Sequence, residues 1–207
     1  MTDLLISLGC VALAVALRPW RALAAEGPPW PWLAWWLALP LLWASDRLAA
    51  SALIQPMSGV PLLVLMAGWP LAVLALLPTA VLTAWLGGLD LWEALHRLVW
   101  LGLVPAGLTV ALGAAVRRWL PHHLFVYILV RGFGMTLLAL TLAGLGALAV
   151  DGVPAGLQAG EVAIARWLSA WGDAFLTGML VAIFVAFRPT WLATWSDRIY
   201  LPPQRRG

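Results

Sequence analysis

Charge is what this sequence has least of. Only 10% of its 207 residues are Asp, Glu, Lys or Arg, whereas 63% are hydrophobic. A soluble domain carries about a quarter charged residues, because its surface must face water. The shortage excludes a water-soluble globular protein and predicts an integral membrane protein whose surface is dissolved in lipid.

Cysteine and lysine are also scarce. Cys10 is the single cysteine, so an intramolecular disulfide is excluded, and all twelve basic residues are Arg. The isoelectric point near 10 would suggest a nucleic-acid partner in a soluble protein. In a membrane protein it more often reflects Arg at the cytoplasmic ends of helices. We therefore expect membrane lipid as a partner, and no nucleic acid.

Several enzyme signatures are missing as well. The chain has no H-E-x-x-H, no G-x-S-x-G, no P-loop and no paired intramembrane Asp motif. His96 is expected near the outer side and His122 and His123 near the inner side, so they cannot face each other across a haem. We expect no catalytic activity and no bound cofactor, with a divalent transition metal considered only as a substrate.

Apolar runs, in contrast, are abundant. A membrane-crossing helix needs about 20 apolar residues, or fewer if it is short or partly re-entrant. The chain has seven such runs, which predicts an all-α membrane protein with about seven transmembrane helices in a single domain, residues 1–207. The expected spans are Leu4–Leu17, Trp30–Trp43, Leu48–Gly68, 71–87, Leu95–Val116, Leu124–Val150 and Val162–Phe187. Pro and Gly interrupt the third.

The placement of Arg predicts the orientation. With an outer N-terminus, Arg47 and Arg97 lie outside together with Asp46, Asp90 and Glu93. The inner loops then carry the remaining basic clusters, Arg18, Arg21, Arg117, Arg118, Arg188, Arg198, Arg205 and Arg206. The positive-inside rule thus favours an outer N-terminus and a cytoplasmic tail over residues 188–207. We expect a multi-pass protein of the inner (plasma) membrane.

The end of the chain resembles a known family. Arg188-Pro189-x-Trp191, then Asp197-Arg198 and Tyr200-Leu201, is similar to the end of energy-coupling-factor (ECF) transporter permeases, which are related to the cobalt-transport component CbiM. Two further stretches, "RRWLPHHLFVYILV" (117–130) and "GDAFLTGML" (172–180), resemble that family too. The resemblance implies a substrate-binding permease component for a transition metal such as cobalt or nickel. A coupling subunit and ATPase subunits would be separate chains.

The chain also departs from that family. Metal-binding members begin Met-His, whereas this chain begins Met1-Thr2, and Pro56 or Val60 stands where they have a His in the third span. The Glu and Asn of their "PEAFLNG" stretch are Asp173 and Thr177 here. These losses favour an alternative function, a non-transporting membrane scaffold or assembly protein that keeps the fold without a metal site.

One candidate metal site follows from spacing alone. Asp90, Glu93 and His96 recur every three residues, and residues three apart share one face of a helix. Carboxylate and imidazole groups on one face could converge on a divalent ion. The alternative interpretation is an ordinary helix start, with Asp90 in the N-cap or first turn and Glu93 paired with Arg97.

Other candidates lie at membrane depth. Asp173 falls near the middle of the seventh span, where a carboxyl is costly unless it binds a substrate or proton or is paired within the protein. Gln55, Met57 and Ser58 interrupt the third span, and irregular polar backbone there must be buried or line a cavity. We expect these four residues at a substrate pocket, with Asp173 facing protein.

The tail supplies candidate docking residues. Arg188, Trp191, Asp197, Arg198 and Tyr200 carry the resemblance but lie beyond the membrane core. We expect the tail to pack against the turn over 117–127 and to form one cytoplasmic surface. That surface would dock a coupling subunit in a transporter, or lock the fold in a scaffold.

Overall fold

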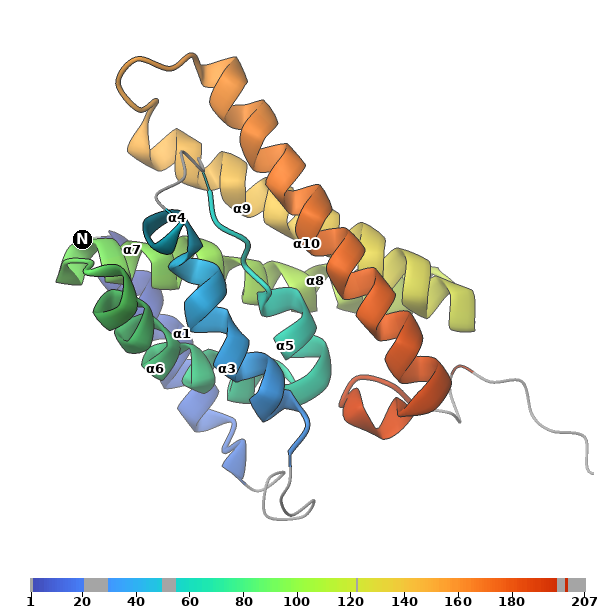
Figure 1. Cartoon of the computed structure of the whole chain (residues 1–207). Helices are drawn as coiled ribbons and strands as arrows, with labels where there is room; N and C mark the ends of the chain where they lie inside the picture. The colour runs from blue at the N-terminus through green and yellow to red at the C-terminus, as the bar shows by residue number, and fades with distance from the viewer. Residues whose placement is uncertain (1, 21–29, 50–54, 122, 197–199, 201–207) are drawn as a thin grey trace, which may run out of the picture.

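The computed structural model describes residues 2–20, 30–49, 55–121, 123–196 and 200 (Figure 1). Within this described part all regular secondary structure is helical. The elements are α1 (Thr2–Ala16), α3 (Trp32–Trp43), α4 (Ser45–Leu48), α5 (Val60–Ala67), α6 (Trp69–Gly87), α7 (Leu91–Arg97), η1 (Leu98–Leu103), α8 (Val104–Trp119), η2 (Val126–Gly134), α9 (Met135–Asp151), α10 (Ala159–Phe187) and η3 (Pro189–Trp191).

Four helical stretches of the described chain are long and apolar enough to cross a membrane. They are α6, the continuous run of α7, η1 and α8, the run of η2 and α9, and α10. Each lies within a few residues of a span expected from the sequence. The all-helical class is therefore confirmed, and the length of these helices indicates a membrane protein.

The other three expected spans are different. α1 and α3 are apolar but have only 15 and 12 residues, fewer than the roughly 20 that a bilayer requires. The third expected span is not one helix: residues 55–59 are non-helical, and α5 after them has eight residues. The described residues therefore confirm four of the seven expected spans by length. In the third, Pro56 and Gly59 precede α5 and interrupt the helix.

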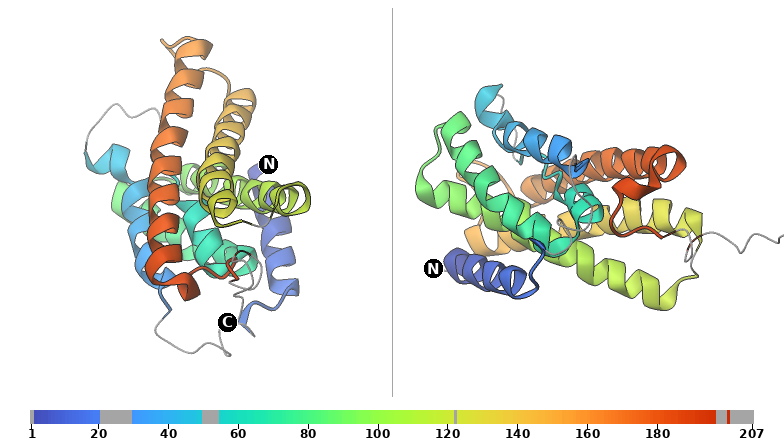
Figure 2. Two further views of the ribbon diagram at one scale, coloured as in Figure 1. Left: turned by 90° about the vertical axis from the view of Figure 1, so that its right-hand side faces the viewer. Right: turned by 90° about the horizontal axis from the view of Figure 1, so that it is seen from below.

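The helices surround the short α5. Figure 1 shows α9 and α10 as a long antiparallel pair, and the views in Figure 2 show α1, α3 and α6 grouped beside them. α5 packs against α3, α6, α8 and α10, and its first seven residues, 60–66, are all buried. The centre of the molecule is therefore a helix too short to cross a membrane.

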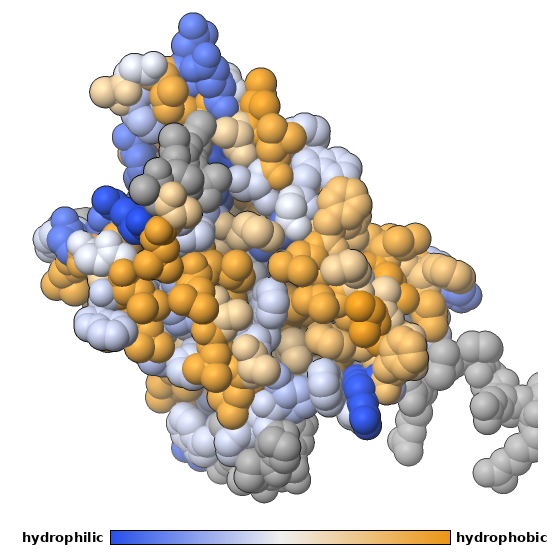
Figure 3. Space-filling view, in the orientation of Figure 1, coloured by the Kyte–Doolittle hydropathy of each residue, from blue (hydrophilic) through white to orange (hydrophobic). Residues whose placement is uncertain are grey.

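The surface is suited to lipid. Large hydrophobic side chains such as Trp85, Phe175 and Phe187 are more than half exposed, and apolar residues cover broad areas of the face in Figure 3. Monomeric soluble proteins rarely expose such broad apolar areas. Inside the bundle, glycines leave room for large side chains. The ring of Trp43 packs against Gly102, and that of Trp100 packs against Gly146.

Gly59 is the residue on which the start of α5 depends. Its φ is +64°, a left-handed conformation that side chains disfavour, and an added Cβ would lie 2.7 Å from Leu39 Cδ2. We expect Gly59→Ala to lower the free energy of unfolding by about 1–3 kcal/mol. Gly107→Ala is the control, because no atom lies within 4 Å of its added Cβ and α8 is helical there. That variant should be neutral or stabilised by up to about 1 kcal/mol. Equal thermal midpoints for the two variants would contradict this account.

Candidate functional site

The start of α5 is held by one carboxylate. Asp173 of α10 is 3% exposed, and its Oδ2 and Oδ1 accept the backbone N–H groups of Ser58 and Gly59, each at 2.8 Å. Gly59 is the N-cap of α5 and Ser58 precedes it, so neither N–H has a partner inside the helix. A negative group also complements the positive end of the helix dipole. Asp173 faces protein, as expected.

Indole and hydroxyl groups bind the backbone of the non-helical segment over residues 55–59. Trp43 Nε1 donates to the carbonyl of Ser58, and Trp35 Nε1 donates to that of Gly59, both at 2.8 Å. Ser169 Oγ donates to the carbonyl of Gln55 at 3.3 Å. Irregular backbone inside the bundle is therefore stable here because side chains from α3 and α10 replace its missing helical bonds.

The Ser58 side chain also binds the backbone of η1. Its Oγ donates to the carbonyl of Leu101 at 2.6 Å. This bond joins the non-helical segment to the long helical run of α7, η1 and α8.

The end of α5 is capped by the C-terminal tail. The backbone N–H groups of Ala193 and Thr194 donate to the carbonyls of Met66 and Leu65 at 3.2 and 3.3 Å. Thr194 Oγ1 donates to the same Leu65 carbonyl at 3.2 Å. Both ends of a buried eight-residue helix are thereby satisfied by segments more than 100 residues later in the sequence.

A chamber of about 200 Å³ lies beside this segment. It is formed where α4, α7, η1, α9 and α10 meet residues 55 and 56. Its polar and aromatic lining is Asp46, Gln55, Glu93, His96, Arg97, Trp100 and Arg166. This chamber is the candidate functional site.

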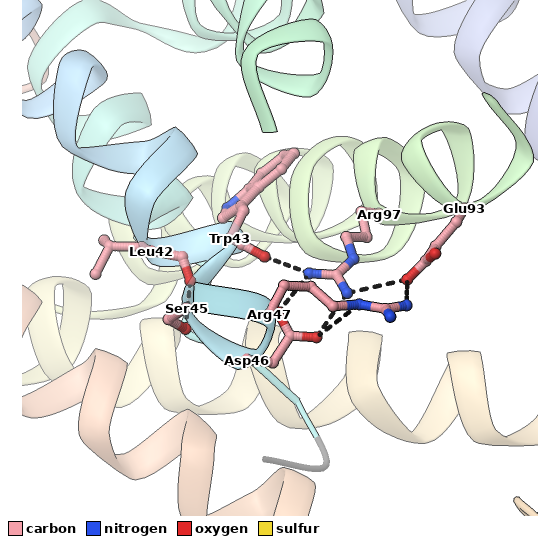
Figure 4. A network of polar contacts seen from close by, with 7 residues as sticks. All are labelled: Leu42, Trp43, Ser45, Asp46, Arg47, Glu93 and Arg97. Carbon is pink, nitrogen blue, oxygen red and sulfur yellow. Dashed lines mark hydrogen bonds and ion pairs between the residues drawn. The ribbon is translucent and has the colours of Figure 1, made fainter. Parts of the chain in front are cut away.

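One wall of the chamber is an ion-pair network (Figure 4). The Arg97 guanidinium donates to both carboxylate oxygens of Asp46 at 2.8 and 2.7 Å, to Glu93 at 3.1 Å, and to the Trp43 carbonyl. Arg47 donates to Glu93 at 2.6 Å. The hydrogen bond from Arg97 lowers the pKa of Asp46 below its usual 3.8. The positive charge of Arg97 is therefore balanced within the protein.

Two further lining residues, Arg166 and Trp100, have donors without acceptors in the described chain. Arg166 Nη1 donates to the Gly144 carbonyl at 2.5 Å, but its buried Nε has no hydrogen-bond partner among the described residues. The buried indole N–H of Trp100 also lacks one there. Because unpaired buried donors cost about 1–3 kcal/mol each, this part of the lining is suited to a ligand that supplies acceptors.

The expected metal trio is not brought together. Asp90 caps α7 by accepting the Glu93 N–H at 2.8 Å, and the Glu93 carboxylate is paired with arginines. His96 lies between the carboxylates of Asp3, at 2.9 Å from Nδ1, and Asp151, at 3.0 Å from Nε2. Within the described residues no group of three His, Cys, Asp or Glu side chains is placed to hold a metal ion. The geometry matches the helix-start interpretation, including the pairing of Glu93 with Arg97.

The four expected pocket residues separate into two sets. Gln55 lines the chamber, whereas Asp173 and Ser58 are buried in the bonds that hold α5. Met57 is half-buried and does not line the chamber. The sequence analysis missed Asp46, Trp100 and Arg166 as lining residues. Of these, Arg166 carried a usable signal, since it is a cation within an expected span.

The tail packs inward at the residues that can be described. Tyr200 is 5% exposed and stacks on Trp195, while Tyr127 Oη and Thr194 Oγ1 lie 2.8 Å apart. Arg188 and Trp191 are exposed. Asp197 and Arg198 lie outside the described residues. The contact with Tyr127 agrees with the expected packing against the turn over 117–127.

No protein-family model, curated protein or solved structure matches the chain. The resemblance to ECF permeases stays a prediction, and the function must be argued from the site.

The role of Asp173 can be tested by removing one acceptor. Asp173→Asn keeps the size of the side chain but turns an NH2 donor towards one of the two backbone N–H groups. We expect the free energy of unfolding to fall by about 1–3 kcal/mol. Glu161→Gln makes the same chemical change on α10, where Gln can still serve the capping box, and should change stability by less than about 0.5 kcal/mol. If denaturant midpoints of the two variants coincide, Asp173 does not hold α5.

The Asp46–Arg97 pair predicts a pH dependence. The pKa of Asp46 is lower in the folded protein than in the unfolded chain. Its contribution to the free energy of unfolding is therefore complete at pH values above the unfolded pKa, and it is lost as the pH falls through the folded pKa. Asp46→Asn should therefore cost about 1–2 kcal/mol near neutral pH, and the difference from wild type should close below about pH 3.8. Asp90→Asn is the control, since Asn caps a helix as well as Asp. Thermal unfolding at several pH values measures both, and a difference that widens in acid would refute the pairing.

Proposed function

We propose that this chain is the substrate-binding membrane component of a transporter and that the chamber binds a small solute with an anionic group. The observation that carries the proposal is that two lining residues, Arg166 and Trp100, have buried N–H groups without acceptors in the described chain. A carboxylate or phosphate oxygen would complete both, and charge-assisted bonds of this kind are about twice as strong as neutral ones.

The charge balance supports an anion over a cation. Arg97 is neutralised by Asp46 and Glu93, whereas no described carboxylate lies within 4.0 Å of the Arg166 guanidinium. An entering anion could pair directly with this guanidinium, because Asp151 interacts with Arg166 only at longer range. The chamber thus favours an anionic or zwitterionic solute.

The size of the chamber limits the solute. Pockets for drug-sized ligands typically occupy about 300–1,000 Å³, and this chamber has about 200 Å³. A molecule of a few heavy atoms fits this volume. Gln55 and Trp100 add an amide and an aromatic ring to the lining.

The resemblance of the tail supports placing the chain in an ECF-type transporter. In this proposal it lies in the plasma membrane with its N-terminus outside and its tail in the cytoplasm, and a coupling subunit and ATPase subunits dock on the tail side. The chamber then opens towards the outer side, where a capture component meets its substrate.

A transition metal is the second candidate substrate. Glu93 and His96, two residues of metal-ligating type, line the same chamber. Metal binding would require Glu93 to exchange its arginine partners for the ion. The third possibility, a scaffold without any substrate, predicts that no solute binds.

Thermal unfolding of the purified protein in detergent separates the three. We expect a small carboxylate or inorganic phosphate to raise the midpoint by several degrees, because binding at about 100 times Kd adds about 2.7 kcal/mol. Arg166→Gln and Trp100→Phe should abolish the shift. The controls Arg118→Gln and Trp85→Phe change exposed residues away from the chamber and should keep it.

Cobalt and nickel chlorides form the second arm of this experiment. A shift with the metals that His96→Ala removes, together with none for anions, would replace the anion by a metal substrate. No shift in either arm would overturn the transporter proposal in favour of a scaffold.

A further inference from the structure

A second cavity lies near the opposite end of the bundle. It has a volume of about 220 Å³ and is lined by residues of α5, α6, α8, η2 and the tail. Among its lining residues are Val64, Trp69, Thr109, Arg117, Arg131 and Thr194. None of them lines the chamber of the proposed function, so this site is independent of it.

Two residues that line the cavity have donors without acceptors in the described chain. Trp69 Nε1 and Arg131 Nε are both buried and have no hydrogen-bond partner in the described part of the chain. Arg131 uses Nη1 to donate to Tyr200 Oη at 3.2 Å, and its guanidinium carbon lies 5.4 Å from the centre of the Tyr127 ring. Neither contact satisfies its Nε.

The position of Arg131 depends on a glycine of α8. A Cβ added at Gly113 would lie 3.3 Å from Arg131 Nε and 3.7 Å from its guanidinium carbon. The absence of a side chain at Gly113 therefore lets the guanidinium lie against α8, one helical turn before Arg117. The two arginines are thus brought from separate helices to one cavity.

The charged side chains among the described lining residues are all positive. Arg117 and Arg131 are its charged lining residues in the described chain, and no described lining residue carries a carboxylate. The remaining wall is largely apolar, including Val64, Leu65 and Val110. Such a combination suits an anion attached to an apolar body, since basic pockets between membrane helices bind anionic lipid headgroups.

We propose that this cavity binds a phosphate group, held by Arg117, Arg131 and the indole N–H of Trp69. The phosphate is that of an anionic phospholipid or of a free phosphate ion. Arginine is well suited to it because the guanidinium offers several N–H donors to phosphate oxygens. The apolar wall would contact the glycerol and upper acyl part of a lipid.

Thermal unfolding in detergent tests the site with three probes: phosphatidylglycerol, phosphatidylcholine and inorganic phosphate. We expect phosphatidylglycerol to raise the midpoint and phosphatidylcholine, which has no net charge, to have little effect. Arg131→Gln and Arg117→Gln should each weaken the apparent affinity by about tenfold or more, the loss of one charge-assisted bond. Arg118→Gln is the matched control, one residue along the same helix and not part of the lining.

Trp69→Phe keeps the test decisive if Arg131→Gln fails to fold. It removes only the N–H group and should weaken phosphatidylglycerol binding while Trp85→Phe does not. The site binds free phosphate if inorganic phosphate raises the thermal midpoint as much as phosphatidylglycerol does. That shift must then be lost in Arg131→Gln and kept in Arg166→Gln. If none of the probes gives a shift dependent on Arg131, Arg117 or Trp69, the cavity is only hydrated and the proposal is wrong. The chamber proposal is unaffected, because it depends on Arg166 and Trp100.

Discussion

Backbone hydrogen bonding inside the bundle is the constraint on which this structure depends. A helix of eight residues in the middle of a membrane protein leaves N–H and C=O groups unpaired at both ends, and lipid offers no water to satisfy them. Asp173 binds the N–H groups at the start of α5, and the backbone of Ala193 and Thr194 binds the carbonyls at its end. The last helix and the tail are therefore needed to complete an element formed much earlier in the sequence.

This constraint also positions the proposed substrate chamber. Residues 55 and 56 line the chamber, and the segment they begin is held by indole and carboxylate groups from α3 and α10. The ion-paired side chains of Asp46 and Arg97 form another part of the chamber lining. Each cavity is lined by one arginine and one tryptophan whose buried N–H groups have no acceptor in the described chain. They are Arg166 and Trp100 in the chamber, and Arg131 and Trp69 in the second cavity. The shared chemistry explains why we assign acceptor-bearing ligands to both cavities.

The sequence predicts the long helices well and the polar contacts poorly. The expected span Val162–Phe187 lies within α10, and Leu124–Val150 nearly matches η2 and α9, because apolar run length depends on local composition alone. Pro56 and Pro61 indicated an irregular third span, but not how short its helix would be. The partners of Asp173 are 114 and 115 residues away, and those of His96 come from α1 and α9. Spacing within one helix cannot reveal partners that only tertiary packing brings near.

Hydrogen exchange of the backbone amides tests the central claim most directly. If Asp173 accepts the N–H groups of Ser58 and Gly59, these amides should exchange as slowly as those in the middle of α10, although their residues are not helical. The amides of Ala193 and Thr194 should also be protected, since they donate to α5. Exchange of the Ser58 and Gly59 amides at the rate of an open loop would contradict the account, because α5 would then begin without its carboxylate cap.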